Sequence, residues 1–391
     1  MRVLILGGDG YLGWPTAMYF SKRGHDVAVL DSYIKRQWED SIGVKPLLPV
    51  SFMDSRIRAW DSATGRKIGS YFVDLTNYID THRVFEDFHP EAIIHYAEQP
   101  SAPFSMMNRK RAVETQVNNL TGTLNVLYAI RKCCPDAHLI KLGTMGEYGT
   151  PDCDIPEGYV DKECIGGGCK PYIDEPCECP MAGLPFPKQP GSIYHLSKVH
   201  DSNNIMFACK TWGMKATDLN QGVVYGIETD EMDGNPELRT SFHYDSIFGT
   251  AINRFCVQAL SGVPITVYGK GNQKRGFLNI NDTLQCVELA ALNSPKPGKM
   301  RVFNQFTEVF TINELAEMVC ECLSWSPVIE HVDNPRTENE EHYYNPTLQN
   351  LPQLGLKPRK LKDELDKMIQ LLSRYNRDID ESTIQPNVKW K

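Results

Sequence analysis

The first half of the chain alternates short apolar runs with longer stretches in which apolar residues recur at helical spacing. The short runs predict β-strands over residues 2–6, 26–31, 70–74, 92–96, 137–142 and 215–219. The longer stretches predict helices over residues 11–23, 78–88, 113–133 and 194–212. Such alternation is typical of a parallel sheet with helices on both faces, so we predict an α/β fold with a doubly wound parallel sheet.

The pattern becomes less regular after residue 225. Helical periodicity covers residues 247–261, 312–323 and 361–375, and strand-like runs cover 265–268, 302–306 and 328–331. We therefore expect a larger domain at 1–225, with a Pro-, Gly- and Cys-rich insertion at about 151–190. A smaller α/β substrate-binding domain is expected at 226–391, with some of its elements returning to the first.

Composition narrows the classes of function. The chain has 391 residues and a formal net charge of −8, which argues against a nucleic-acid-binding protein, since that class carries a basic patch or stripe. Local arginines and helix N-termini are still able to bind an anionic substrate. No apolar run is long enough to span a membrane. Residues 2–6 are already a strand, with no basic-then-apolar leader before it, so we expect a cytoplasmic protein.

A glycine pattern follows the first predicted strand. Gly7, Gly10 and Gly13 are spaced three apart at a strand-to-helix turn, where the backbone is able to approach a pyrophosphate and the helix N-terminus supplies amides. Asp31 ends the next strand, where an acid meets adenosine ribose hydroxyls and repels a 2′-phosphate. The pattern predicts a Rossmann-type domain that binds NAD rather than NADP, with residues 32–69 forming one or two helices over the cofactor mouth.

A second signal lies far along the chain. Tyr194 and Lys198 are four residues apart, so they share one face of a predicted helix. The lysine is able to lower the pKa of the phenol, which then acts as an acid/base group toward a substrate hydroxyl. Thr144, just past the strand at 137–142, is placed to hydrogen-bond the same oxygen. Together with the glycine turn, these residues predict an NAD-dependent enzyme that oxidises a carbinol.

Further motifs extend across nearly the whole chain. They lie at residues 7–13, 142–151, 194–201, 216–226, 248–258, 302–308, 334–336 and 341–345. On these motifs the chain resembles the extended short-chain dehydrogenases/reductases that act on nucleotide sugars, and among them the UDP-sulfoquinovose synthases. The resemblance implies C4 oxidation of UDP-glucose, elimination at C5/C6, addition of sulfite at C6 and re-reduction by the bound cofactor. It also implies a homodimer.

The resemblance carries over to individual residues. It implies cofactor contacts at Gly7, Gly8, Asp9, Gly10, Tyr11, Leu12, Gly13, Asp31, Arg36, Asp74, Leu75, Asn118, Tyr194, Lys198 and Val224. It implies substrate contacts at Thr144, Gln221, Thr250, Asn253, Arg254, Thr266, Tyr268, Gln273, Arg275 and Arg336. The guanidinium forks of Arg275 and Arg336 suit the diphosphate.

The chain departs from related sugar 4,6-dehydratases beside the catalytic threonine. Those enzymes carry Thr-Asp-Glu, whereas Met145 and Gly146 follow Thr144 here. A group for C5 and C6 must therefore come from elsewhere, and Glu147 and His195 are the candidates. Met145 would offer the incoming sulfite dianion an uncharged surface. The alternative is that Glu147 and His195 only orient their neighbours.

A second departure follows Glu98 and Gln99. The family has an arginine at the next position, expected near the substrate, whereas this chain has Pro100. Arg109 or Arg111 is a possible replacement for the missing cation.

Twelve cysteines divide into two groups. Seven are scattered and suit small core positions: Cys133, Cys134, Cys209, Cys256, Cys286, Cys320 and Cys322. Five crowd into the insertion: Cys153, Cys164, Cys169, Cys177 and Cys179. Their spacing is not that of a usual zinc site, so a metal, disulfides and free thiols all stay open, and we predict no metal in the active site.

Two other functions fit part of this pattern. A UDP-sugar 4-epimerase needs the same tyrosine, lysine and NAD, but no sulfite. A non-catalytic NAD-sensing module needs the glycine turn, but it has no use for Thr144, Tyr194 and Lys198 together.

Overall fold

The computed structural model describes residues 1–160, 182–336, 341–386 and 388–390, and within them a parallel sheet of seven strands forms the centre. The strands are β1 (Arg2–Leu6), β2 (Asp26–Asp31), β3 (Gly69–Phe72), β4 (Ala92–His95), β5 (His138–Thr144), β6 (Lys215–Gln221) and β10 (Met300–Gln305). Their order is β10-β6-β5-β4-β1-β2-β3, as in a Rossmann-type fold. The six strands predicted in the first half are all present.

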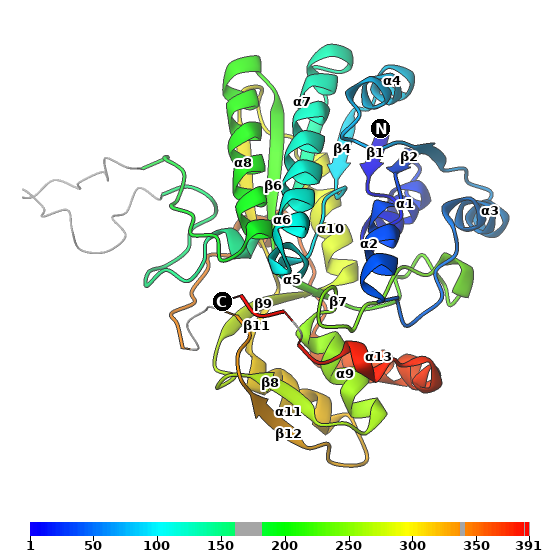
Figure 1. Ribbon diagram of the computed structural model, residues 1–391. Helices are drawn as coiled ribbons and strands as arrows, with labels where there is room; N and C mark the ends of the chain where they lie inside the picture. The colour runs from blue at the N-terminus through cyan, green and yellow to red at the C-terminus, as the bar shows by residue number, and fades with distance from the viewer. Residues whose placement is uncertain (161–181, 337–340, 387, 391) are drawn as a thin grey trace, which may run out of the picture.

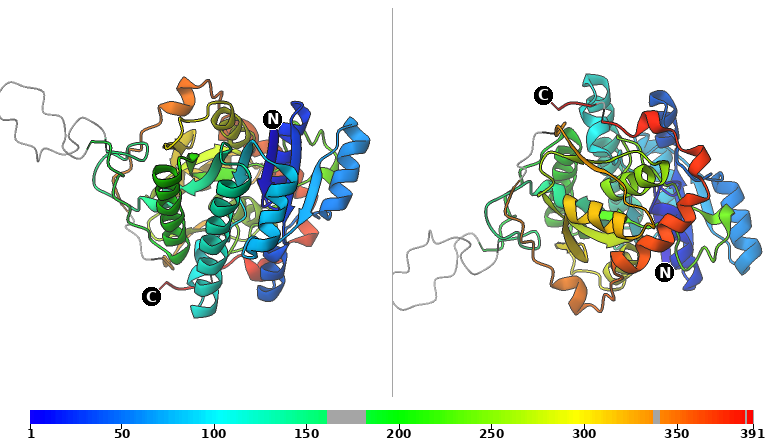
Figure 2. Two further views of the ribbon diagram at one scale, coloured as in Figure 1. Left: turned by 90° about the horizontal axis from the view of Figure 1, so that it is seen from above. Right: turned by 90° about the horizontal axis from the view of Figure 1, so that it is seen from below.

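Helices cover both faces of this sheet (Figures 1 and 2). One layer contains α4 (Tyr78–Phe88), α7 (Gly122–Cys133) and α8 (Ile193–Trp212), and its apolar side chains pack on Leu4, Leu6 and Ile93. The other contains α1 (Gly13–Lys22), α3 (Met53–Thr64) and α10 (Ile280–Leu292), which pack on Val3 and Ile5. Successive residues of β1 thus enter opposite cores, as expected of a strand buried on both faces.

The segment between β2 and β3 holds two helices, as predicted. These are α2 (Ile34–Ile42) and α3, joined by an irregular stretch at 43–52. Tyr33 precedes α2 in the left-handed region at φ 56°, which turns the chain sharply at the end of β2. The turn brings α2 over the carboxyl end of the sheet.

The helix predicted over 113–133 is present, but it contains a π-helical turn. The structure has α5 (Ala102–Met106), α6 (Arg109–Gln116), a π-helical turn η1 (Val117–Thr121) and then α7. The π turn carries Asn119, whose buried side chain accepts from the backbone N–H of Gln99 at 2.7 Å and donates to Ser197 Oγ at 2.8 Å. These bonds tie the loop after β4 to α8, and apolar periodicity does not record them.

A smaller unit lies below the carboxyl ends of the large sheet (Figure 1). Its strands are β7 (Val223–Tyr225), β8 (Ile265–Tyr268), β9 (Lys274–Asn279), β11 (Glu308–Thr311) and β12 (Ile329–Val332). They pair as β11-β9-β7 and as β12-β8. Its helices are α9 (Ala251–Ser261), α11 (Ile312–Glu321) and α13 (Leu361–Ser373), whereas α12 (Asn350–Gln353) packs its Leu351 into the core of the larger unit. Short 3₁₀ turns η2 (Met145–Glu147), η3 (Pro236–Leu238), η4 (Asn376–Asp378) and η5 (Glu381–Thr383) lie elsewhere in the chain.

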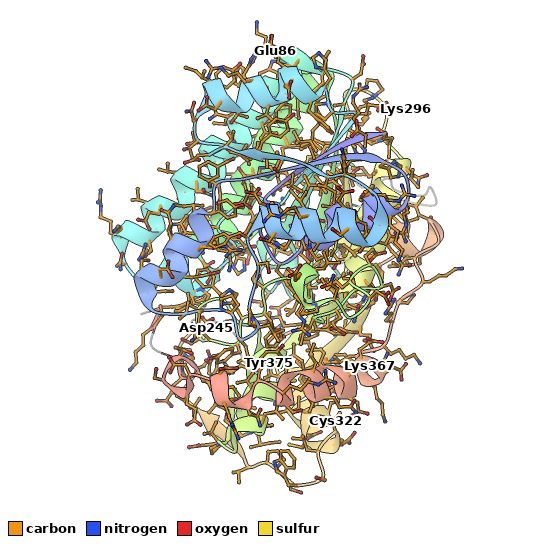
Figure 3. The ribbon with its side chains drawn as sticks, turned by 90° about the vertical axis from the view of Figure 1, so that its right-hand side faces the viewer. Glu86, Asp245, Lys296, Cys322, Lys367 and Tyr375 are labelled. Carbon is orange, nitrogen blue, oxygen red and sulfur yellow. The ribbon has the colours of Figure 1, made fainter. Side chains whose placement is uncertain are left out.

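One apolar core holds much of the smaller unit together. It joins Phe255 of α9, Val267 of β8, Leu315 of α11 and Leu365 of α13. Figure 3 shows α13, with Lys367 and Tyr375 labelled beside it, at the opposite end of the molecule from Glu86 and Lys296. Helix α9 begins at Ala251, four residues later than predicted, because Asp245 accepts from the N–H groups of Ile247 and Phe248 and so fixes a turn there.

Besides α12, two elements of the second half return to the larger unit. Strand β10 pairs in parallel with β6, from Met300 beside Ala216 to Gln305 beside Gln221. Helix α10 packs its Leu284 and Val287 into the core beneath α1. The strand predicted at 302–306 exists, but it belongs to the large sheet.

In the described residues, no helix is long and apolar enough to cross a membrane. Cys209, Cys256 and Cys286 are buried, and Cys153 is a partly buried free thiol. The other four cysteines of the insertion, Cys164, Cys169, Cys177 and Cys179, lie outside the described residues. In the described part of the chain, no three His, Cys, Asp or Glu side chains form a group that would hold a metal ion.

Candidate active site

The glycine turn between β1 and α1 forms the floor of one cavity. Gly7 has φ 88°, and a Cβ there would lie 2.8 Å from the backbone nitrogen of Ala97. A Cβ on Gly13 would lie 2.0 Å from the Gly7 carbonyl oxygen. Only glycine fits these two positions. The turn therefore leaves bare backbone against the cavity, as a pyrophosphate at a helix N-terminus requires.

This cofactor cavity has a volume of about 510 Å³. Most of the predicted cofactor residues line it: Gly7, Asp9, Gly10, Tyr11, Leu12, Gly13, Asp31, Arg36, Asp74, Leu75 and Asn118. Gly8 does not, because it packs on the Val29 side chain. Val224 and Tyr194 line a neighbouring cavity instead.

Two carboxylates shape the adenosine side of the cofactor cavity. Asp31 at the end of β2 accepts from the backbone N–H groups of Asp9 and Tyr33 at 2.8 and 2.7 Å. Burial, with the nearby Asp9 charge, raises the pKa of Asp31 to about 6. Asp9 itself binds the Arg36 guanidinium through both oxygens and also pairs with the buried Arg56. Asp9 and Arg36 therefore bind each other, and Asp31 lines the same cavity.

A second cavity of about 400 Å³ lies between the ends of β5 and β6 and the smaller unit. Its walls include the predicted residues Thr144, Tyr194, His195, Gln221, Val224, Thr250, Asn253, Arg254, Tyr268, Gln273, Arg275 and Arg336. Tyr11, Leu12, Lys35, Pro100, Leu142 and Ser241 line both cavities. The two cavities therefore form one cleft, with the cofactor cavity at one end and this substrate cavity at the other.

Helix α8 presents the tyrosine and the lysine. Its N-cap is Ser192, whose Oγ accepts from the His195 N–H at 3.1 Å. One turn apart, the Lys198 ammonium lies 5.8 Å from the centre of the Tyr194 ring. Lys198 donates to the Leu142 carbonyl oxygen at 2.6 Å, which ties α8 to the end of β5. The predicted pair is thus brought together on one turn of α8, but only Tyr194 lines the substrate cavity, and Lys198 lines neither cavity.

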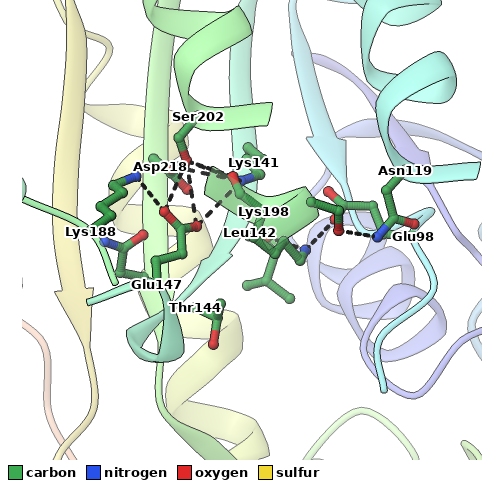
Figure 4. Close-up of polar contacts among 12 residues, drawn as sticks. Glu98, Asn119, Lys141, Leu142, Thr144, Glu147, Lys188, Lys198, Ser202 and Asp218 are labelled. Atoms are coloured by element: carbon green, nitrogen blue, oxygen red, sulfur yellow. Dashed lines mark hydrogen bonds and ion pairs between the residues drawn. The ribbon is translucent and has the colours of Figure 1, made fainter. Parts of the chain in front are cut away.

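The pKa of Tyr194 is raised above its usual value, because burial outweighs the opposing effect of Lys198. Lys198 does not act as an isolated charge: its ammonium forms a buried ion pair with Glu98 at 2.6 Å (Figure 4). No sequence motif marks Glu98 as a partner of Lys198. The only available signal was an acidic residue shortly after a buried strand, β4.

Glu147 was predicted to act on C5 and C6 of the sugar, but it does not lie in the substrate cavity. It is fully buried and lines neither cavity. Its carboxylate pairs with Lys141 at 3.6 Å and with Lys188, and it accepts from Ser202 (Figure 4). Although burial alone would raise its pKa, these ammonium groups hold the pKa of Glu147 below the usual range. A direct role of Glu147 toward C5 or C6 of a sugar is therefore wrong.

The turn η2 explains why Thr144 lines the substrate cavity whereas Met145 and Glu147 do not. Thr144 ends β5 in the substrate cavity, with its Oγ accepting from the Gly146 N–H at 3.2 Å. The 3₁₀ turn then carries Met145 into an apolar cluster with Tyr148 and Phe186. Met145 therefore does not line the substrate cavity, contrary to the expectation that it offers a surface to sulfite.

His195 is the candidate that the structure does bring to the cavity. Ser192 Oγ lies 3.1 Å from its Nδ1. A Cβ on Gly146 would lie 2.4 Å from its Nε2. The imidazole therefore occupies the space that any side chain at position 146 would need.

Three arginines line the far side of the substrate cavity. Arg254 is buried and donates to the Thr266 carbonyl oxygen at 2.9 Å, with its guanidinium 4.1 Å from the Tyr268 ring centre. Arg275 and Arg336 line the same cavity. Thr266 does not line it, because its side chain is buried against Gln258 at 2.8 Å. That prediction is wrong for the side chain, although the Thr266 backbone orients Arg254.

Neither candidate replaces the missing cation beside Pro100. Arg109 is exposed, and Arg111 pairs with Glu114 at 2.8 Å and with Ser41. The cation that lines both cavities with Pro100 is Lys35, from α2. It pairs with Glu39 and lies 2.9 Å from His243 Nε2.

Comparison with known proteins agrees with this geometry. Residues 3–304 match the model of the NAD dependent epimerase/dehydratase family. The chain is 48% identical over its whole length to the chloroplastic UDP-sulfoquinovose synthase of Spinacia oleracea, covering 79% of that protein. It is 40% identical, again over its whole length, to the UDP-sulfoquinovose synthase of Sulfolobus acidocaldarius, covering 98% of that protein.

Solved structures show the same fold at lower identity. The UDP-glucuronic acid 4-epimerase of Bacillus cereus, in complex with UDP-glucuronic acid and NAD, is 18% identical with a TM-score of 0.66. The UDP-glucose 4-epimerase of Thermotoga maritima is 19% identical with a TM-score of 0.64. Each comparison covers 96% of this chain and 99% of the solved one.

Proposed function

Because the chain belongs to the NAD dependent epimerase/dehydratase family and to its UDP-sulfoquinovose synthases, we propose that it converts UDP-glucose and sulfite to UDP-sulfoquinovose. The observation that carries this proposal is the joint placement of Thr144, Tyr194 and His195 in one substrate cavity beside the cofactor cavity. The residues at 145–147 supply no carboxylate to that cavity, which disfavours an ordinary dehydratase.

The cofactor cavity fits NAD. The backbone at Gly7 and Gly13 leaves room that a Cβ would fill. The Asp31 carboxylate, which lines the cavity, is the proposed acceptor for the ribose hydroxyls. Tyr11 and Leu142 lie where the cofactor and substrate cavities meet. NAD, when bound, takes a hydride from C4 of the sugar and returns it at the end of the cycle.

Tyr194 and Thr144 act on the C4 oxygen. The Tyr194 phenolate is the base that takes the C4 hydroxyl proton, and Thr144 holds the same oxygen by a hydrogen bond. Lys198 stabilises the phenolate electrostatically. When C4 is reduced again, Tyr194 gives the proton back, so the residue serves as base and then as acid in one turnover.

His195 is the residue proposed for C5 and C6. Oxidation at C4 acidifies the C5 hydrogen, and loss of that proton and of the C6 hydroxyl gives an unsaturated ketone to which sulfite adds. Ser192 Oγ lies 3.1 Å from Nδ1 and so orients the imidazole, which lines the substrate cavity. A neutral or cationic imidazole beside C6 also avoids repelling the sulfite dianion, as a carboxylate would.

Arg254, Arg275 and Arg336 are proposed to bind the diphosphate, and Tyr268 to flank the uracil. Arg254 carries the strongest support, since it is buried and has no carboxylate partner among the described residues. A buried guanidinium of this kind suits a phosphate ligand.

A homodimer is also proposed. Val113, Val117, Leu124 and Tyr128 are exposed apolar residues along α6, η1 and α7. Exposed apolar side chains gathered on one face are typical of a protein–protein contact. A cytoplasmic location stays a prediction, and the spinach relative is named as chloroplastic.

Mass spectrometry of the protein incubated with UDP-glucose, with and without sulfite, tests the main proposal. A product in which a sulfonate replaces the C6 hydroxyl, formed only with sulfite, is the expected result. UDP-galactose formed regardless of sulfite would establish a 4-epimerase instead. A Tyr194→Phe variant is the control: a catalyst loses turnover, whereas an NAD-sensing module does not respond.

A further inference from the structure

The ammonium of Lys198 is fixed from two directions. The Leu142 carbonyl oxygen accepts from it at 2.6 Å, and Glu98 Oε2 lies 2.6 Å away on the cofactor side. Both charged side chains are almost completely buried, at 3% and 1% exposed. Water does not screen this pair, so each charge strongly affects groups nearby.

The pair is not explained by stability alone. Neither carboxylate oxygen of Glu98 accepts a well-directed hydrogen bond from the described residues, and Oε1 has no ionic partner there either. A buried acceptor left without a donor costs free energy, and a buried ion pair often stabilises no more than apolar residues of the same volume. Because burying the Glu98 carboxylate costs free energy that its ion pair does not clearly offset, we look for a role of Glu98 in the site.

Lys198 has no other carboxylate partner among the described residues. Glu147 and Asp218 lie beside Lys141, at 3.6 and 3.9 Å. Asp201, on the next turn of α8, has a pKa raised well above its usual value by burial and by the Glu98 charge. The remaining titratable neighbour, His95, has its pKa lowered to about 4 by burial and is neutral.

We propose that Glu98 is a positioning residue for Lys198: its carboxylate holds the ammonium at the end of β5 and offsets its positive charge. Tyr194 therefore holds its proton more tightly than it would beside an unpaired lysine. The inference rests on the proposed function only in taking Tyr194 as the acid/base group.

The reaction needs such a balance. Tyr194 must remove a proton from the C4 oxygen and later return the same proton, and a phenol that is too acidic would be slow to return it. The electrostatics agree, since burial raises the pKa of Tyr194, Lys198 lowers it, and Glu98 raises it again. Glu98 thereby keeps one residue able to work in both directions.

The test titrates Tyr194 directly in NAD-loaded protein, by NMR of tyrosine labelled with ¹³C at the ring carbon that bears the hydroxyl. Tyr194→Phe assigns the signal. In Glu98→Gln the negative charge is lost and Lys198 acts alone, so we expect the Tyr194 transition to move to lower pH by about one unit. The acid limb of the pH profile for C4 oxidation, followed as cofactor reduction by UDP-glucose, is expected to move by the same amount.

Two variants separate this role from simple packing. Glu231→Gln removes another buried carboxylate, which pairs with Arg23 at 3.2 Å and lines neither cavity, and it is expected to leave the transition in place. Glu98→Asp keeps the charge but shortens its reach, so we expect an unchanged transition and about tenfold slower C4 oxidation. If Glu98→Gln does not fold, Glu98→Asp still tests the positioning role.

An unchanged Tyr194 transition in Glu98→Gln would overturn the proposal, and so would normal C4 oxidation in Glu98→Asp. Failure of the proposed function appears separately, as wild-type protein that forms no sulfite-dependent product. The NMR titration does not depend on that product, so it reports on Glu98 in either case.

Discussion

The cofactor and substrate cavities of one cleft are built in different ways. The cofactor cavity takes its floor from one short turn, residues 7 and 9–13, and an acid at the end of the next strand. The substrate cavity collects side chains from β5, α8, α9 and β9, and from Arg336 near the end of the chain. A short local motif therefore identifies the first, whereas the second exists only once distant segments have folded together.

The largest expected effect separates chemistry from cofactor binding. Tyr194→Phe removes the acid/base group but no wall of the cofactor cavity, so we expect kcat to fall about 10³-fold while NAD content stays the same. Turnover and cofactor released on denaturation are the measurements. If turnover and NAD content fall together, Tyr194 contributes to cofactor binding, and the two cavities are not independent.

The next largest effect separates two steps within the substrate cavity, C4 oxidation and proton transfer at C5 and C6. His195→Gln is expected to lower formation of the sulfonated product about 10²-fold, because C5 and C6 lose their proton-transfer group while Tyr194 is untouched. Reduction of bound NAD by UDP-glucose reports C4 oxidation, and solvent deuterium at C5 reports the later step. Equal loss of both signals would mean that His195 only orients its neighbours.

A smaller effect is expected at the diphosphate side. Arg254→Met is expected to raise KM for UDP-glucose about 30-fold with little change in kcat, since charge-assisted hydrogen bonds to phosphate are lost. Steady-state kinetics measure this. Arg109→Met, which changes an exposed arginine outside both cavities, is the matched control and should have wild-type KM.

The smallest effect concerns the cofactor cavity. Burial raises the pKa of Asp31 to about 6 in the cofactor-free protein, and only the charged form accepts from both ribose hydroxyls. NAD affinity should therefore fall as pH is lowered through about 6. Asp31→Asn should bind about tenfold more weakly at pH 8 and lose this pH dependence. Calorimetric titration of cofactor-stripped protein measures both, and an unchanged pH dependence in the variant would remove Asp31 from the ribose site.

Much of the larger unit follows from sequence periodicity. Strands β1 and β2 and helix α4 have the predicted bounds, because each combines an apolar pattern with clear ends. The π turn at 117–121 could not be predicted in this way, since it is set by the bonds of Asn119 to a distant loop. Strands β7, β9 and β11 were missed, and they pair only with one another, within the smaller unit.

The same distinction holds for the candidate site: residues fixed by local spacing could be predicted, and residues fixed by tertiary contacts could not. Tyr194, Thr144 and the glycine turn could be assigned because spacing along a helix or a turn fixes their faces. Glu147 is three residues from Thr144, yet η2 turns it behind the sheet toward Lys141, and no spacing rule gives the direction of a 3₁₀ turn. Glu98 has no motif at all, since its partner lies a hundred residues away and meets it only in the folded sheet.

Strand β10 pairs with β6 although about eighty residues separate them along the chain, so the large sheet is completed late in synthesis. The ribosome synthesises Met300–Gln305 only after the first strands of the smaller unit, so β6 has an unpaired edge until then. An unpaired edge strand is a template for association with other chains, and pairings that wait for distant segments form slowly. We therefore expect chains that end before residue 300 to aggregate during synthesis, and this nascent state to be the one in which a chaperone is most needed.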